Sequence, residues 1–249
     1  MFRLKALPVL RDNLVWLLEG PQGRLVVDPG DAGPVLAALG DPARPTAILV
    51  THHHADHVDG VPGIVERTGA RVHAPADPRL RFAYEAVGDG QCFEAAGFHI
   101  EVIAVPGHTR SHVAFHVEGH LFCGDTLFSL GCGRLFEGTP AEMQASLARL
   151  AALPGDTRVC CGHEYTLANG DFARAVEAEN PAREAWLAEA RRRLAEGRAS
   201  LPSTLAIERA ANPFLRLDAP GVQAGLAARG LPHAGIEGFA ALRAWKDAF

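Results

Sequence analysis

Four side chains that can bind a metal ion lie close together in residues 51–57, which read T-H-H-H-A-D-H. They are His52, His54, Asp56 and His57. Imidazole nitrogens and carboxylate oxygens are ligands that zinc, iron and manganese accept. The apolar run at residues 47–50 predicts a buried strand directly before them. A surface run of histidines or a helix cap would not require a carboxylate among imidazoles at a strand end, so the pattern favours a metal site.

The spacing within this motif suggests two groups of ligands. His52 and His54 are two positions apart, so in extended backbone they share one face. His53 points to the opposite face, and we expect it to be exposed or to support a ligand without binding the metal itself. Asp56 and His57 follow the bend after the strand and can serve a second metal ion.

Three further apolar runs, at residues 99–105, 120–123 and 158–161, each lead into a glycine and a residue able to bind a metal. These residues are His108, Asp125 and His163. Glycine permits a sharp turn or a close approach of two backbones. A single histidine or aspartate after a strand more often caps a helix or bonds to the backbone. Four strand ends that all supply ligands are better explained by convergence on one metal centre.

Longer segments are similar to a known family. Residues 131–139 (G-C-G-R-L-F-E-G-T), residues 161–165 (C-G-H-E-Y) and the helical C-terminal extension resemble glyoxalase II, the hydroxyacylglutathione hydrolases of the metallo-β-lactamase superfamily. The resemblance extends over nearly the whole chain, from residues 6–13 to residues 242–249. It implies an α/β fold, the metallo-β-lactamase αββα sandwich, followed by a C-terminal helical domain.

The resemblance also implies a site for two divalent metal ions per chain. His52, His54 and His108 would hold the first ion. Asp56, His57 and His163 would hold the second ion, and Asp125 would bridge the two. Asp56 and Asp125 would be the catalytic residues, beside a metal-bridging water that acts as nucleophile. We expect zinc, although iron and manganese are compatible with these ligands.

Substrate binding is implied for five residues of the family pattern, namely Arg134, Phe136, Tyr165, Arg243 and Lys246. Some members have lysine and tyrosine in place of Arg134 and Phe136; arginine keeps the charge but presents a planar fork, and phenylalanine lacks the hydroxyl. Arg243 and Lys246 are three positions apart in a predicted helix and project to the same side. The residues alone would favour an exposed cationic face at a helix end, and only the resemblance favours binding. Tyr165 would equally fit a packed aromatic.

Asp28 follows another apolar run, at residues 25–27, near the expected site. A metal-bound histidine usually donates its second ring N–H to a carboxylate or carbonyl. We therefore expect Asp28 to support a ligand in the second coordination sphere.

Local signals predict the organisation of the chain. Thr139 to Glu142 form a capping box with proline at the first helical position, which predicts a helix to about residue 150. Asn180 and Pro181 begin a helix that ends at about residue 196, and the last helix covers residues 237–245. We expect a catalytic domain over residues 1–165 and a helical substrate-binding domain over residues 166–249, with the substrate cleft between them.

Composition excludes several classes of protein. The 249 residues are 48% hydrophobic, enough for a large core. A net charge of −5 gives no sign of nucleic-acid binding. No apolar run approaches the roughly 18 residues of a membrane span, and we find no signal peptide. The five cysteines form no C-x-x-C pair, which favours reduced thiols. We expect a cytoplasmic monomer.

The expected function is hydrolysis of S-(2-hydroxyacyl)glutathione, such as S-D-lactoylglutathione, to glutathione and a 2-hydroxy acid such as D-lactate. This is the second step of methylglyoxal detoxification. One alternative is a persulfide dioxygenase with the same fold and a single iron. Others are a broader metallo-thioesterase and a metal-binding module without activity. Residues 131–139 and the second ligand set argue against the dioxygenase, and the intact ligand set argues against an inactive module.

Overall fold

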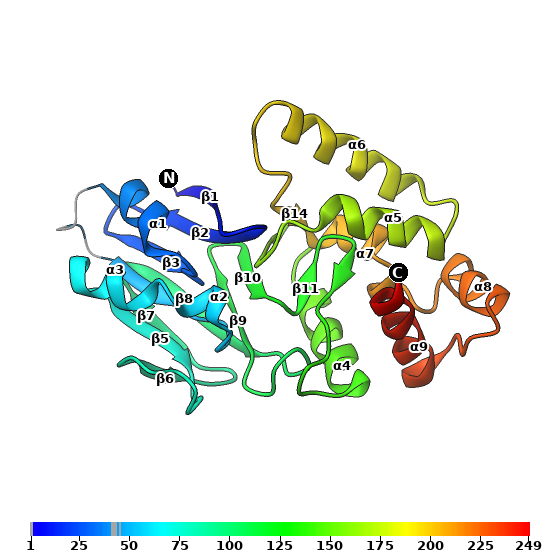
Figure 1. The fold of residues 1–249 in the computed structure, drawn as a ribbon, viewed down its shortest axis with the longest axis horizontal. Helices are drawn as coiled ribbons and strands as arrows, with labels where there is room; N and C mark the ends of the chain where they lie inside the picture. Colours follow the sequence, from blue (N-terminus) through cyan, green and yellow to red (C-terminus); the bar gives the residue numbers. More distant parts are fainter. Residues whose placement is uncertain (1, 41–43, 45) are drawn as a thin grey trace. The chain divides into compact units, whose positions relative to one another are not determined.

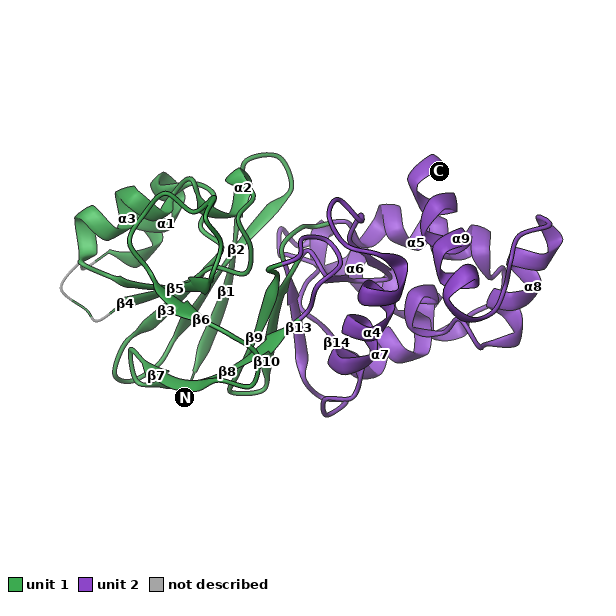
Figure 2. Ribbon diagram, turned by 90° about the horizontal axis from the view of Figure 1, so that it is seen from below, with its two compact units in different colours: residues 1–104, 111–124, 162–164 green, residues 105–110, 125–161, 165–249 purple. Residues whose placement is uncertain are grey.

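A computed structural model describes residues 2–40, 44 and 46–249 (Figure 1). The chain divides into two compact units (Figure 2). Unit 1 comprises residues 1–104, 111–124 and 162–164. Unit 2 comprises residues 105–110, 125–161 and 165–249. Each unit therefore combines segments that are distant in sequence. The expected functional division at residue 165 stays a prediction.

Unit 1 contains two sheets. The first has the strand order β1-β2-β3-β4-β5-β6, with antiparallel pairing from β1 to β3 and parallel pairing from β3 to β6. Its strands are Arg3–Val9, Asn13–Glu19, Arg24–Val27, Thr46–Leu49, Arg71–Pro75 and Glu85–Val87. In the second sheet, unit 1 contributes β10-β9-β8-β7. These strands are Cys92–Ala95 (β7), Phe98–Ala104 (β8), Val113–Val117 (β9) and His120–Gly124 (β10).

Apolar side chains bind these layers together. Helices α1 (Ala32–Leu39) and α3 (Val61–Thr68) cover one face of the first sheet, where Val35 and Ile64 share a buried cluster with strand residues such as Ile48. The short helix α2 is Ala55–Val58. The second sheet lies on the opposite face (Figure 2), where the rings of His73 and Phe93 are 4.5 Å apart. In the parallel strand β4, the consecutive residues Ala47, Ile48 and Leu49 are all buried, so both faces of the strand are covered, which matches its continuous apolar sequence.

Unit 2 is mostly helical. Its helices are α4 (Pro140–Ala151), α5 (Thr166–Val176), α6 (Pro181–Ala195), α7 (Leu205–Ala211), the 3-10 helix η1 (Pro213–Leu215), α8 (Pro220–Ala228) and α9 (Gly235–Ala248). Two short antiparallel pairs accompany them: β11 (Leu127–Phe128) with β12 (Gly131–Cys132), and β13 (Arg158–Cys161) with β14 (Ser203–Thr204). No helix within the described ranges is both long and apolar enough to cross a membrane.

The predicted starts of α4 and α6 are confirmed. Thr139 and Glu142 form a reciprocal capping box at the start of α4, and the Asn180 side chain accepts a hydrogen bond from the Arg183 backbone at the start of α6. Helix α9 begins two residues earlier and ends three residues later than expected. The starts of α4 and α6 were predictable because capping is a local interaction that the sequence encodes directly, whereas α9 has no side-chain cap.

Helix α8 packs closely against the end of α5 at Gly225. A Cβ atom added at Gly225 would lie 1.8 Å from the Val176 carbonyl oxygen. Gly225→Ala should therefore lower the free energy of unfolding by about 1–3 kcal/mol. Gly33→Ala in α1 is the control, because the nearest atom to its added Cβ is 3.4 Å away. Urea titrations that showed the same unfolding free energy for both variants would contradict this packing.

Candidate metal centre and substrate pocket

The buried carboxylate of Asp28 fixes the start of the histidine motif in unit 1. Strands β3 and β4 pair in parallel with Val27 opposite Leu49, so Asp28 lies at the same sheet edge as the motif. Its Oδ1 accepts the Thr51 backbone N–H (2.7 Å), and its Oδ2 accepts the Thr51 hydroxyl (2.7 Å). The same Oδ2 is 3.2 Å from His57 Nδ1. A neutral His57 that donates from Nδ1 keeps Nε2 available for a metal.

Gly124 is required beside this motif. Its φ is +47°, and an added Cβ would lie 2.3 Å from the Thr51 hydroxyl oxygen and 2.8 Å from the His112 ring. Both the conformation and the space exclude a larger residue. The expectation that glycine permits a close approach here is confirmed. His112, which sequence reasoning missed, stacks on His52 with ring centroids 4.6 Å apart.

The three adjacent histidines lie after the end of β4 at Leu49, and their side chains have different partners. His52 is buried, and its Nε2 lies 3.0 Å from His54 Nδ1. His53 turns to a different partner, because its Nδ1 lies 3.5 Å from the Asp77 carboxylate. Hydrogen bonds from Arg79, above all, lower the pKa of Asp77 far below its usual value, so His53 faces a permanent anion.

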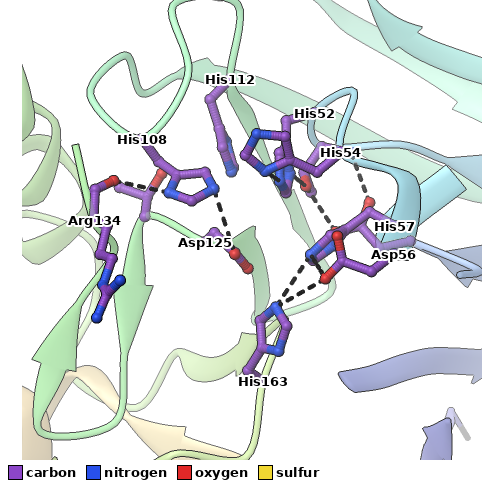
Figure 3. A network of polar contacts seen from close by, with 12 residues as sticks. His52, His54, Asp56, His57, His108, His112, Asp125, Arg134 and His163 are labelled. Atoms are coloured by element: carbon purple, nitrogen blue, oxygen red, sulfur yellow. Dashed lines mark hydrogen bonds and ion pairs between the residues drawn. The ribbon is translucent and has the colours of Figure 1, made fainter. Parts of the chain in front are cut away.

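Asp56, His57 and His163 form a compact group of potential ligands. His57 Nε2 and His163 Nε2 are 3.3 Å apart, and each lies 3.5 Å from Asp56 Oδ2 (Figure 3). Tetrahedral ligands at zinc–nitrogen distances of about 2.0–2.1 Å are separated by about 3.4 Å. The residues present therefore fit a divalent metal ion.

Two neighbouring residues near the N-terminus orient this group. Asp12 Oδ1 lies 2.7 Å from His163 Nδ1, so the opposite ring nitrogen, Nε2, is the one that faces His57 and Asp56. The Asn13 side-chain amide donates to Asp56 Oδ2 at 2.8 Å. Sequence reasoning assigned neither residue a role, although both lie in the segment at residues 6–13 that resembles the family. Their pairing with residues much later in the chain is set by the fold.

In unit 2, His108 and Asp125 face each other. His108 Nδ1 donates to the Arg134 carbonyl at 2.9 Å, and His108 Nε2 lies 3.5 Å from Asp125 Oδ2 (Figure 3). Both side chains are buried. The backbone of Arg134 thus orients this histidine, as a carboxylate orients the other two.

A cavity of about 390 Å³ in unit 2 brings the expected substrate residues together. Its lining includes His108, Asp125, Arg134, Phe136, Tyr165, Arg243 and Lys246. Phe136 is 63% exposed. Cations and aromatic rings therefore share one cavity with two potential metal ligands, which suits an anionic substrate with an apolar part.

Arg243 is not part of an exposed cationic face, so that alternative is wrong. Only 5% of the residue is exposed. One of its terminal nitrogens donates to the Cys132 carbonyl at 2.6 Å, and the other donates to Asp247 at 3.1 Å. Lys246 is half-buried, and this burial, together with Arg243 and Arg134, lowers its pKa.

Comparisons place this geometry among known proteins. A model of the metallo-β-lactamase superfamily matches residues 9–163, and one of the hydroxyacylglutathione hydrolase C-terminus matches residues 164–249. A hydroxyacylglutathione hydrolase of Ectopseudomonas mendocina (strain ymp) is 52% identical, with complete coverage of both chains. One of Xylella fastidiosa (strain M12) is 49% identical over 99% of this chain and 97% of its own.

A solved structure adds to these matches. TTHA1623 in a di-iron-bound form is 28% identical, has a TM-score of 0.60, and the match covers 86% of this chain and 100% of that one. The shared fold and the His/Asp clusters together indicate a dinuclear metal site.

The Asp12 carboxylate should control metal affinity without binding the metal. Asp12→Ala leaves His163 without its orienting partner, so we expect metal affinity to fall about 10–100-fold. Asp31→Ala is the control, because Asp31 only caps α1 by accepting the Gly33 backbone N–H at 2.9 Å. Chelator competition measures the affinity. Equal affinity of the Asp12 variant and wild type would show that Asp12 does not orient His163.

Proposed function

Since the chain belongs to the hydroxyacylglutathione hydrolase family of the metallo-β-lactamase superfamily, we propose that it hydrolyses the thioester of S-(2-hydroxyacyl)glutathione. Its fold is the αββα sandwich followed by a C-terminal helical domain. The products are glutathione and a 2-hydroxy acid, with S-D-lactoylglutathione as the expected substrate and D-lactate as its product. The cavity of unit 2 carries the proposal, because it joins cations to potential metal ligands.

The proposed ligand set is that of the sequence pattern: His52, His54 and His108 for one ion, Asp56, His57 and His163 for the other, and Asp125 as the bridge. Zinc is the proposed metal, with iron and manganese as alternatives. When bound, the two ions supply a water of lowered pKa as nucleophile and polarise the thioester carbonyl.

The chain's own residues prepare this chemistry by fixing which ring nitrogen of each histidine carries the proton. Asp28, Asp12 and the Arg134 carbonyl each occupy a histidine Nδ1, so the opposite Nε2 needs no reorganisation before it binds a metal. The leaving group needs little help, because a thiol of pKa about 8.5 departs readily as the thiolate. No serine or cysteine nucleophile is required.

Recognition of the glutathione part rests on the cationic side of the cavity. Lys246 and Arg134 both line it, and their charges can pair with the substrate's carboxylates. Arg243 supplies charge as well, but its terminal nitrogens already bond to the chain. Phe136 and Tyr165 provide apolar surface at the same cavity.

The dioxygenase alternative is not favoured. Relatives about half identical over their full length are hydroxyacylglutathione hydrolases, and Asp56, His57 and His163 offer a second ligand group that a single iron would not use. We also propose a cytoplasmic monomer. Five free cysteines, four of them buried, support the cytoplasm, where thiols stay reduced.

Metal content tests the dinuclear assignment. Protein purified without chelator should contain about two divalent ions per chain. Asp125→Ala should lose metal and turnover because it removes the proposed bridge. His53→Ala is the matched control and should retain both, since His53 faces Asp77. Elemental analysis that gave one iron per chain, with oxygen uptake on glutathione persulfide, would favour the dioxygenase.

Lys246 should act on substrate affinity and not on the chemical step. A half-buried charged contact is worth about 1–2 kcal/mol, so Lys246→Ala should raise KM for S-lactoylglutathione five- to thirty-fold with kcat nearly unchanged. Lys5→Ala is a control, because Lys5 pairs with Glu19 in unit 1. A short thioester without the glutathione carboxylates should be a poor substrate, and its KM should not change in Lys246→Ala. An equally good truncated substrate would instead indicate a general metallo-thioesterase.

A further inference from the structure

The β11–β12 hairpin, residues 127–132, is held by side chains from later helices of unit 2. Its turn leaves backbone groups that the two-stranded pairing does not satisfy. Leu130 at the turn has a φ of +59°, a conformation that is unfavourable for a leucine. Such a conformation persists only where the surroundings enforce it.

Glu208 of α7 enforces this turn. Its Oε2 accepts the Leu130 backbone N–H at 2.8 Å and the Asn212 side-chain amide at 3.1 Å. Its Oε1 accepts the Ser203 hydroxyl at 2.6 Å. Glu208 is completely buried, and burial raises the pKa of its carboxyl. A buried acid is costly unless it is hydrogen-bonded, and here both carboxyl oxygens accept hydrogen bonds.

Asn212 makes further hydrogen bonds to the turn. Its side-chain amide donates to the carbonyls of Phe128 (3.1 Å) and Gly131 (3.0 Å). Asn169 of α5 donates to the Ser129 carbonyl at 3.0 Å. Trp186 of α6 donates from Nε1 to the Ser129 hydroxyl at 2.8 Å. Side chains of α5, α6 and α7, together with the α7 C-cap Asn212, therefore bond directly to the four consecutive residues 128–131.

The hairpin in turn controls the position of the candidate metal ligands in unit 2. Asp125 lies two residues before the hairpin. Gly133 directly follows it, so close to Asp125 that an added Cβ would lie 1.9 Å from the Asp125 carbonyl oxygen. The Gly133 N–H donates to the Thr126 carbonyl at 3.2 Å. Next in sequence, the Arg134 carbonyl accepts the bond that orients His108. A shift of the turn would move both ligands.

We propose that Glu208 and Asn212 are positioning residues for the metal centre, acting through the β11–β12 hairpin on Asp125 and His108. The proposal rests on the proposed function for its link to turnover. It assigns to the C-terminal helices a second task besides substrate binding, because their buried polar side chains shape the segment that carries the metal-bridging aspartate.

Glu208→Ala is the main test, with Glu208→Gln as the conservative variant. A glutamine oxygen can accept from both Leu130 and Asn212 while its amide donates to Ser203, so the hairpin should be retained. Glu177→Ala is the matched control, because Glu177 is also a buried acid of unit 2 but bonds to Asn180 and Arg216, away from the hairpin. Trp186→Phe is a milder probe that removes one bond to the turn.

Three measurements separate positioning from simple destabilisation: amide hydrogen exchange in residues 127–133, metal per chain, and kcat corrected for the folded fraction. Glu208→Ala should exchange faster in this segment, hold less metal and lose about tenfold or more in kcat. Trp186→Phe should shift the same readouts less. Glu208→Gln should restore all three, and Glu177→Ala should change stability alone.

Several results would overturn the proposal. The proposal fails if folded Glu208→Ala keeps the hydrogen exchange and the metal content of the wild type. It also fails if Glu208→Ala and Glu177→Ala lose equal amounts of metal and of kcat. If Glu208→Ala does not fold, unchanged exchange and metal content in Trp186→Phe would be decisive against it. A wild-type chain that is inactive on S-lactoylglutathione would refute the proposed function. Hydrogen exchange and metal content need no substrate, so these two measurements would still test the positioning role.

Discussion

The conformation of the histidine motif depends on the hydrogen bonds of the buried Asp28 carboxylate. A carboxylate removed from water must find donors, and the donors here are the backbone and hydroxyl of Thr51 and the His57 ring. The first two bonds fix where the chain leaves β4. The third fixes which nitrogen of His57 carries the proton. One desolvated group thus sets both the backbone course and the ligand tautomer.

The same constraint recurs with other partners. Asp12 acts on His163, and the Arg134 carbonyl acts on His108. In each case a fixed acceptor takes the Nδ1 proton and leaves Nε2 as the available electron pair. Because the acceptors come from separate segments, the fold must be complete before all the ligands are prepared. Metal that binds this prepared site more tightly than it binds the unfolded chain should consequently stabilise the fold.

The sequence predicted those parts whose signals are local. The strand before His52, the capping box at Thr139 and the start of α6 at Asn180 depend on neighbours a few residues away. The sequence also predicted a separate partner for His53, which is Asp77, although residues 52–54 lie beyond the end of β4 and strand alternation does not apply to them. Partners far apart in sequence were not predictable in this way. The bond between Asp12 and His163 joins residues 151 positions apart, and no periodicity encodes it.

Arg243 shows why burial cannot be inferred from helical spacing alone. Three positions separate it from Lys246, so the two share a helix side, yet Arg243 is buried and Lys246 is only half-buried. The difference follows from their partners. The planar guanidinium of Arg243 can bond to the Cys132 carbonyl and to Asp247 at once.

The ammonium of Lys246 has a different environment, 5.2 Å from the Phe172 ring. An aromatic face stabilises a cation without consuming its hydrogen-bond donors, so Lys246 keeps donors for a ligand. The two cations on helix α9 therefore have different roles. Arg243 fixes the strand β12 that follows the hairpin turn, and Lys246 remains available to an incoming carboxylate.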